Sequence, residues 1–469
     1  MQGPGPDAGK LFYVADALWA DSEIWRIPMI DIKQHFTYSR LLRYTFSSIV
    51  MMVFSSIYCV VDGLFLSNYA GKTAFVAANF IYPFPMILGG VGFMFGSGGS
   101  ALVAKTMGEA HMEKANRIFS NLVTLSVWTG VGLTIFGLIF LKPVAIAFGA
   151  EGPLLRDSLI YGGIIMLGIP AVVVQYEFQN LFVTADKPKL GLYSTVASGL
   201  TNIVLDALFV AVFSWGMAGA AIATVLSQYV GGVLPILYFG RANSSKLQIR
   251  RAKMDWKAML RICTNGCSEL LNNISISIVT IVYNMQLLKY AGDNGVAANG
   301  VLMYIDFVFI SIFIGYVVGV SPIISFHYGA QNHREIGSLL RKSVVIMLVT
   351  SVVMFLLSEA CARPVSMLFV SYDQELLDIT LRGFLLYSFI FLFSGIAIFS
   401  SAFFTALNNG LISAILSFVR TIIFQISFVL ILPVFWGMDG IWLSLVFAEL
   451  LAVILGTILI LANRKRYHY

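Results

Sequence analysis

Long, uninterrupted runs of apolar residues constrain this chain more than any other feature. A helix that crosses the hydrocarbon core of a bilayer needs about 20 consecutive, mainly apolar residues. Twelve stretches of that kind follow one another along the 469 residues. They lie at about 43–66, 76–103, 118–141, 159–184, 190–213, 217–240, 258–288, 296–325, 342–361, 380–405, 411–433 and 438–462. Because the runs are continuous and do not alternate with polar residues, they predict membrane helices and not barrel strands.

The small share of charged residues excludes most classes of soluble protein. Only 12% of the residues are charged, whereas a soluble domain usually has about 25%. Soluble enzymes, disulfide-rich secreted folds and disordered chains are excluded, because too few polar side chains remain to coat their surfaces.

Among the four cysteines, Cys263 and Cys267 lie four positions apart, with no histidine or third cysteine near them. We therefore expect no metal site at this pair.

Lysine and arginine gather in a few segments, and their distribution predicts the orientation of the chain. In membrane proteins these residues are enriched in cytoplasmic loops. The richest group follows the sixth apolar run, and smaller groups precede the first run and follow the last. The residues are Arg241, Lys246, Arg250, Arg251, Lys253, Lys257 and Arg261 in the linker and just after it, Lys33, Arg40 and Arg43 up to the start of the first run, and Arg464, Lys465 and Arg466 in the tail. We expect both termini and the linker in the cytoplasm, and no nucleic-acid partner.

An internal repeat divides the chain into two halves. Tyr69-Ala70-Gly71 recurs as Tyr290-Ala291-Gly292, and Trp215-Gly216-Met217 recurs as Trp436-Gly437-Met438, each displaced by 221 residues. Two homologous halves of six helices insert the same way up, so their pseudo-two-fold axis should run along the membrane normal, as in transporters with parallel repeats. The sequence therefore predicts an all-α polytopic membrane protein of two six-helix bundles. Its units are an N-terminal cytoplasmic or interfacial segment (1–42), an N-lobe (43–240), a basic linker (241–257), a C-lobe (258–462) and a cytoplasmic tail (463–469).

Several short motifs resemble those of a known transporter family. They are Val61-Asp62-Gly63-Leu64-Phe65 at the end of the first helix, Asn202-Ile203-Val204-Leu205-Asp206 in the fifth, Ala104-Lys105-Thr106-Met107-Gly108-Glu109-Ala110 after the second and His327-Tyr328-Gly329-Ala330-Gln331-Asn332 after the eighth. Together with the two six-helix halves, they resemble the multidrug and toxic compound extrusion (MATE) transporters, and most closely their MepA-like bacterial branch. The resemblance covers about 43–462. It implies that Na⁺ or H⁺ enters while an amphiphilic, often cationic compound leaves through the cytoplasmic membrane of a bacterium.

Acidic residues inside the apolar runs are the candidate chemical groups. A charged side chain at the centre of a membrane helix costs about 2.5–3.5 kcal/mol on insertion scales, so each one needs a reason. One base, Arg420, lies in mid-helix. The acids are Asp62, Glu177, Asp206, Glu269, Asp306 and Glu449. An excess of carboxylates suits a site that binds cations and does not suit an anion carrier.

The N-lobe holds the main predicted site for the coupling cation. Asp62 lies four residues after Tyr58, and Asp206 four residues after Asn202, so each pair shares a helix face. The resemblance implies that the positions of the family's N-lobe cation site are occupied here by Tyr58, Asp62, Asn202, Asp206 and Thr224. Their oxygens could hold a shared proton, or Na⁺ at Asp62, Asn202 and Asp206. In the alternative interpretation, Asp206 accepts a hydrogen bond from Asn202, and Asp62 caps its helix.

The repeat does not duplicate these acids. At the displacement of 221 residues, Asp62 corresponds to Tyr283 and Asp206 corresponds to Ser427. Acids that only held the helices together would be expected in both halves. The asymmetry therefore favours a dedicated ion site in the first half.

In the C-lobe, Glu269 and Asp306 are candidates for substrate binding or coupling. Glu269 resembles a helix-7 carboxylate that some family members use, but the partner acid of those members is missing between 380 and 405. Glu269 could instead pair with the substrate, or with Asp306 through a shared proton. Arg420 and Glu449 are expected to pair for structural reasons. Glu177 receives no role.

The leading hypothesis is a secondary multidrug antiporter that works as a monomer in the bilayer by alternating access. We expect no enzymatic activity and no cofactor besides the coupling ion, and the choice between Na⁺ and H⁺ stays open. A phosphate-cradling glycine-rich motif with lysine is missing, which argues against direct use of ATP. The alternative is a lipid-linked saccharide flippase of the same superfamily. Such a protein would line its cavity with basic residues, and Arg420 alone is too little.

Overall fold

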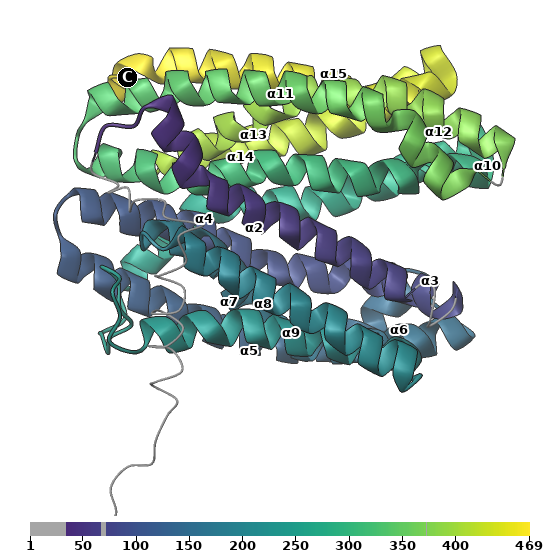
Figure 1. Ribbon diagram of the computed structural model, residues 1–469, viewed down its shortest axis with the longest axis horizontal. Coiled ribbons are helices and arrows are strands. Elements are labelled where there is room, and N and C mark those ends of the chain that lie inside the picture. The colour runs from purple at the N-terminus through teal and green to yellow at the C-terminus, as the bar shows by residue number, and fades with distance from the viewer. Residues whose placement is uncertain (1–33, 67–71, 372) are drawn as a thin grey trace, which may run out of the picture.

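A computed structural model describes residues 34–66, 72–371 and 373–469. Within these ranges the chain is helical and contains no strand, which confirms the predicted all-α class. Figure 1 shows long helices that run along the longest axis in two groups, with the first helix crossing diagonally between them. The two groups are the predicted N-lobe and C-lobe.

The described residues of the N-lobe form eight α-helices and one π-helical turn. They are α2 (Tyr38–Phe65), α3 (Lys72–Ile81), α4 (Pro83–Gly108), α5 (Met112–Ala147), α6 (Gly152–Leu167), α7 (Ile169–Thr184), α8 (Pro188–Asp206), η3 (Ala207–Val212) and α9 (Gly216–Phe239). Prolines at the starts of α4 and α7 explain two of the breaks, because proline removes a helix hydrogen bond. The axes of α6 and α7 differ by 55° at the second break.

The C-lobe is built from fewer and longer elements. They are α10 (Trp256–Gly329), α11 (His333–Val370), α12 (Gln374–Tyr387), η4 (Ser388–Ile390), α13 (Phe391–Ala406), α14 (Gly410–Phe418), η5 (Val419–Gln425) and α15 (Ile426–Tyr467). Gly292 and Gly437 have φ values of 59° and 56° inside α10 and α15, so each of these helices is two helices joined at a glycine. Positive φ is easily reached only without a Cβ.

The number of membrane spans agrees with the prediction. In the described residues, ten helical stretches are long and apolar enough to cross a membrane, and the bent pair α6–α7 makes an eleventh. The 58-residue stretch Gly410–Tyr467 counts once among the ten, but the break at Gly437 divides it into two. When this stretch is counted as two helices, the described residues hold twelve candidate spans, six in each lobe.

Two predicted boundaries shift. Helix α2 begins at Tyr38 and not at 43, because the Thr37 side chain accepts a hydrogen bond from the Arg40 backbone and caps the helix there. At the other end, α15 continues to Tyr467, so most of the predicted tail 463–469 is helical. Arg464, Lys465 and Arg466 occupy its last turn, where positive charge is favourable.

The repeat is visible in the backbone as well as in the sequence. Ala110 and Gln331, which are displaced by 221 residues, both have positive φ after α4 and α10. Gly216 and Gly437 form a second pair of this kind, both with φ of 56°. Because corresponding positions adopt the same rare conformation, the two halves share one fold and not only scattered sequence identities.

The lobes pack closely at the end of the molecule that carries the linker, which we call the linker end (on the left in Figure 1). A Cβ at Gly108 would lie 2.0 Å from the Phe326 carbonyl oxygen, and one at Gly329 would lie 2.0 Å from that of Lys105. These two contacts exchange under the repeat, so the pseudo-two-fold axis passes between α4 and the second half of α10. Only glycine permits this approach.

The linker itself is fastened to the N-lobe. The Gln248 backbone donates to the Asn116 side chain at 2.8 Å, and the Arg250 backbone donates to Ser120 Oγ at 2.8 Å. Asn121 in turn donates to the Lys253 carbonyl at 3.0 Å. The basic linker therefore lies along the first turns of α5 and has a defined path.

Candidate functional site

Three helices of the N-lobe meet at the predicted cation site. Helix α2 approaches α8 at Gly199, where a Cβ would lie 2.6 Å from the Phe54 ring and 2.9 Å from the Tyr58 ring. Helix α8 is joined to α9 by a hydrogen bond of 2.7 Å from Ser198 Oγ to the Ser227 carbonyl. These contacts bring the last turns of α2 and α8 beside the middle of α9.

The Asp62 carboxylate lies at the centre of this meeting point. It accepts a hydrogen bond of 3.2 Å from Thr224 Oγ1 on α9. The side chains of Asp206 and Asn202 on α8 are also its immediate neighbours. The structure thus gathers four of the five predicted residues from three separate helices.

Burial differs across this group. Asp206 and Asn202 are almost completely buried, whereas Asp62 and Thr224 are partly exposed. The side-chain polar atoms of Asn202 and Asp206 have no well-formed hydrogen bond to any described residue. The first part of the alternative interpretation, a hydrogen bond from Asn202 to Asp206, is therefore wrong in this conformation, while the capping of its helix by Asp62 stays a prediction.

The donor set suits a hard cation or a proton. Two carboxylates, one amide oxygen and one hydroxyl converge, and oxygen ligands of this kind bind hard cations. Among the described residues, no lysine or arginine forms an ion pair with Asp62 or Asp206. Because buried polar atoms without partners are costly, the group has unused capacity for a small cation.

Tyr58 contributes in a different way from the other four residues. Its ring packs over Gly199 at the contact between α2 and α8, and its hydroxyl lies beside Ser55. Tyr58 therefore lies at the contact between the two helices that carry the acids, within electrostatic reach of Asp62.

In the C-lobe, Arg420 pairs with one predicted acid and acts electrostatically on two others. Arg420 Nε donates to both oxygens of Glu449, at 2.8 and 3.0 Å, and Gln425 donates to the same carboxylate at 3.2 Å. The predicted pairing of Arg420 with Glu449 is confirmed. Asp306 lies beside the Tyr387 hydroxyl. Arg420 is close enough to act electrostatically on both Glu269 and Asp306. The two predicted C-lobe acids therefore share a positively charged neighbour.

Glu177 lies apart from both groups. It is fully buried in α7, its Cα is 3.1 Å from where a Cβ on Gly96 of α4 would lie, and Ser126 of α5 is its polar neighbour. Neither of its carboxylate oxygens has a well-formed hydrogen bond to a described residue. Its place is the interior of the N-lobe, between three helices.

Two π-helical turns lie next to charged residues, one in each lobe. The turn η3 follows directly after Asp206, and η5 contains Arg420. Such turns are rare and occur often at functional sites. Sequence periodicity does not reveal them, and it also missed Tyr387 and Gln425 as partners of the C-lobe charges.

A comparison with known proteins agrees with this geometry. A family model described as MatE matches residues 47–208 and 270–431, one segment in each lobe. The multidrug export protein MepA of Staphylococcus haemolyticus (strain JCSC1435) is 22% identical over 437 residues, which are 92% of this chain and 94% of that protein. MepA of Staphylococcus aureus (strain MRSA252) is 21% identical over 435 residues, again 92% and 94% of the two chains.

Solved structures share the fold. A MATE structure in complex with MaL6 superposes with a TM-score of 0.87 at 21% identity, covering 93% of this chain and 97% of that one. An outward-facing multidrug resistance MATE family transporter of the MOP superfamily gives a TM-score of 0.86 at 21% identity, with the same coverage.

Proposed function

Since the chain belongs to the MatE family, we propose that it is a secondary antiporter that exports amphiphilic, often cationic compounds in exchange for Na⁺ or H⁺. The family match in both lobes and the relatives named as multidrug export proteins support an efflux function. The family resemblance seen in the sequence is confirmed. The proposal also includes the coupling ion, the alternating-access cycle, the monomeric state and the cytoplasmic position of both termini.

One observation carries the proposal for coupling. Three helices of one lobe bring together four polar side chains, those of Asp62, Asp206, Asn202 and Thr224. The two carboxylates have no basic partner among the described residues. Two ionised carboxylates in one site repel each other. A bound Na⁺ or a shared proton relieves that repulsion, so the group is suited to exchange a cation.

The bound cation shifts the equilibrium between two conformations. A ligand moves such an equilibrium only by its differential affinity for the two states. We propose that loading of the N-lobe site draws α2, α8 and α9 together and weakens drug binding in the central cavity between the lobes. One charge that moves down a potential of 100 mV supplies about 2.3 kcal/mol, which is enough to concentrate a substrate roughly fifty-fold.

The flippase alternative is weaker. A cavity for lipid-linked saccharides would need basic side chains to bind phosphate. The mid-helix base Arg420 is held by Glu449 and is therefore not free for such a ligand.

The test is dye efflux from proteoliposomes that contain the purified chain, with Na⁺ and H⁺ gradients imposed separately. Asp62→Asn and Asp206→Asn should each abolish gradient-driven efflux, because an amide can neither release a proton nor contribute a negative charge. Both variants should insert and elute as the wild type does on size exclusion. If both variants export dye at the wild-type rate with unchanged dependence on pH and Na⁺, the N-lobe site does not couple transport.

A further inference from the structure

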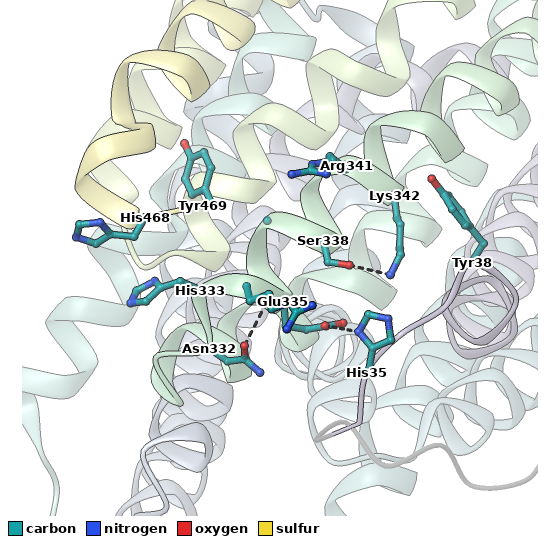
Figure 2. Close-up of a pocket in the computed structure, with 12 residues that line it drawn as sticks. His35, Tyr38, Asn332, His333, Glu335, Ser338, Arg341, Lys342, His468 and Tyr469 are labelled. Carbon is teal, nitrogen blue, oxygen red and sulfur yellow. Dashed lines mark hydrogen bonds and ion pairs between the residues drawn. The ribbon is translucent and has the colours of Figure 1, made fainter.

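A second site lies at the linker end, away from the acids. A pocket of about 830 Å³ opens between the start of α11, the residues that lead into α2, and the end of α15. Figure 2 shows its side chains, which come from both lobes. The basic side chains and histidines that line it are His35, His333, Arg334, Arg341, Lys342 and His468, and Glu335 is the one Asp or Glu side chain among its lining residues. Three of the five histidines of the chain therefore line one pocket.

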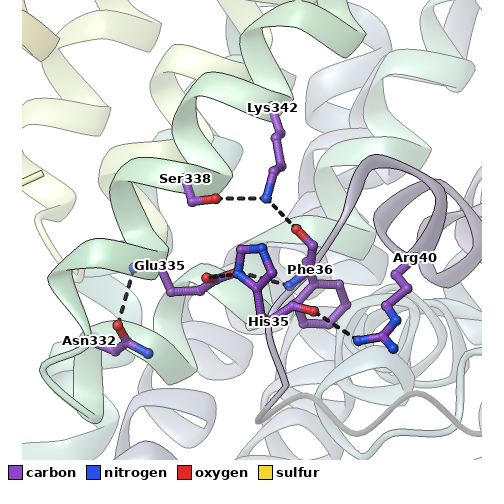
Figure 3. A network of polar contacts seen from close by, with 7 residues as sticks. All are labelled: His35, Phe36, Arg40, Asn332, Glu335, Ser338 and Lys342. Carbon is purple, nitrogen blue, oxygen red and sulfur yellow. Dashed lines mark hydrogen bonds and ion pairs between the residues drawn. The ribbon is translucent and has the colours of Figure 1, made fainter.

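The acid in this pocket is already engaged. Glu335 accepts a hydrogen bond of 3.0 Å from the Phe36 backbone through one oxygen, and its other oxygen lies 2.5 Å from His35 Nδ1. Lys342 donates to the Phe36 carbonyl and, at 2.7 Å, to Ser338 Oγ. Figure 3 shows that this network ties the residues before α2 to the start of α11. Glu335 therefore anchors His35 and Phe36, and it forms no ion pair with the pocket's arginines.

The remaining positive charge has no counterion within the part of the chain that the structure describes. Arg334 and Arg341 form no ion pair there. Lys342 forms none either, and with two of its three N–H donors used it keeps one for a ligand. Arginine side chains bind phosphate oxygens with two parallel hydrogen bonds, and lysine adds a compact charge. The pocket is therefore suited to a phosphate group.

The surfaces that leave the pocket are apolar. On α2, Tyr38, Leu42 and Phe46 are 46%, 44% and 47% exposed at successive turns of one face. On α11, Val345 and Leu348 follow the basic residues and are 44% and 46% exposed. A phosphate bound beside Lys342 would thus lie where the polar start of α11 passes into its apolar span.

From this combination we propose that the pocket binds the phosphate headgroup of an anionic phospholipid, whose acyl chains lie along the exposed faces of α2 and α11. Basic pockets between membrane helices are known to hold anionic headgroups. Because the walls come from α2 in the N-lobe and α11 in the C-lobe, the lipid contacts both lobes where they are packed together. This site is independent of the cation site and of the exported compound.

The experiment counts bound lipid on the purified full chain by native mass spectrometry. The chain in non-ionic detergent is titrated with dioleoyl-phosphatidylglycerol, and in parallel with dioleoyl-phosphatidylcholine, which has the same acyl chains and no net charge. The pocket variant is Arg334→Gln/Arg341→Gln. The control is Arg250→Gln/Arg251→Gln, which removes the same charge from exposed positions of the linker. Arg341→Gln alone serves if the double variant does not fold.

We expect the wild type to prefer phosphatidylglycerol, and the pocket variant to lose about tenfold in affinity for it. Of the three pocket cations that form no ion pair among the described residues, this variant removes two. The linker control should stay within about twofold, because Arg250 and Arg251 are as exposed as the pocket arginines but do not line the pocket. Equal loss in both variants, or no preference between the two lipids, overturns the proposal. A third arm uses inorganic phosphate. If phosphate alone protects the chain from thermal unfolding and displaces the lipid at equal concentration, the ligand is a soluble phosphate and the lipid assignment is wrong.

Discussion

Arg420 and Glu449 show what a single buried charge requires in this chain. The Glu449 side chain is 1% exposed and that of Arg420 16% exposed, and the arginine has no other ion pair among the described residues. Removing one partner of a buried ion pair leaves the other uncompensated, which costs about 3–5 kcal/mol. Replacing both partners by apolar residues of similar size is often neutral. The pair is therefore a structural element, in contrast to the unpaired carboxylates of the N-lobe.

At this scale we predict that Glu449→Gln acts mainly on stability. The variant should unfold at a lower temperature in detergent, because Arg420 keeps its charge and loses its counterion. Arg420→Met/Glu449→Leu should recover most of the loss, since neither charge then remains buried. Thermal unfolding followed by tryptophan fluorescence measures both. A double variant that is less stable than Glu449→Gln would show that the pair does more than compensate charge.

Helix packing decides whether the two N-lobe acids are neighbours. Gly199 lets α2 lie directly against α8, and the Tyr58 and Phe54 rings fill the space where a side chain would stand. We predict that Gly199→Val pushes the two helices apart, with a loss of about 1–3 kcal/mol in the free energy of unfolding from overpacking. The larger effect should be on coupling, because Asp62 moves away from Asp206. Gly132→Val in α5 is the matched control, since a Cβ at Gly132 meets no atom within 4 Å.

Gradient-driven dye efflux measures the two glycine variants. Gly199→Val should lose most of its dependence on Na⁺ and pH, while Gly132→Val should behave as the wild type. Efflux from Gly199→Val with normal dependence on both ions would mean that the contact between α2 and α8 does not set the geometry of the ion site.

The sequence predicted helix positions better than the partners of individual side chains. Runs of apolar residues located all twelve spans, because burial in lipid depends on local composition. The i, i+4 spacing and the family resemblance placed Asp62 near Asp206, but nothing local could show that Asn202 leaves its amide unpaired. Glu177 received no role for the same reason, since its neighbours on α4 and α5 are distant in sequence. The start of α2 was missed because a single capping threonine, and not hydropathy, determines it.

At the scale of the whole molecule, the proposed alternating-access cycle needs a state in which the lobes are packed at the linker end, and in this structure they are. Ser56 of α2 and Ser311 of α10 belong to different lobes, and their hydroxyl oxygens are 3.3 Å apart. Ser401 of α13 and Ser413 of α14 have oxygens 3.0 Å apart within the C-lobe. Both pairs are close enough for a disulfide after replacement by cysteine. They therefore offer a crosslink between lobes and a matched crosslink inside one lobe.

We predict that Ser56→Cys/Ser311→Cys, in a background whose four native cysteines are replaced by serine, loses transport on oxidation and regains it on reduction. The disulfide holds α2 against the second half of α10, so a transport cycle that separates these two helices cannot be completed while the bond is closed. Ser401→Cys/Ser413→Cys should form its disulfide and continue to transport, because both residues move with the same lobe. Dye efflux before oxidation, after oxidation and after reduction measures each effect, and a mass shift on a denaturing gel shows that the bond has formed. If the crosslink between lobes forms completely and efflux continues at the wild-type rate, the two lobes do not separate at this contact during transport. Transport would then depend on a movement within each lobe and not on rocking of one lobe against the other.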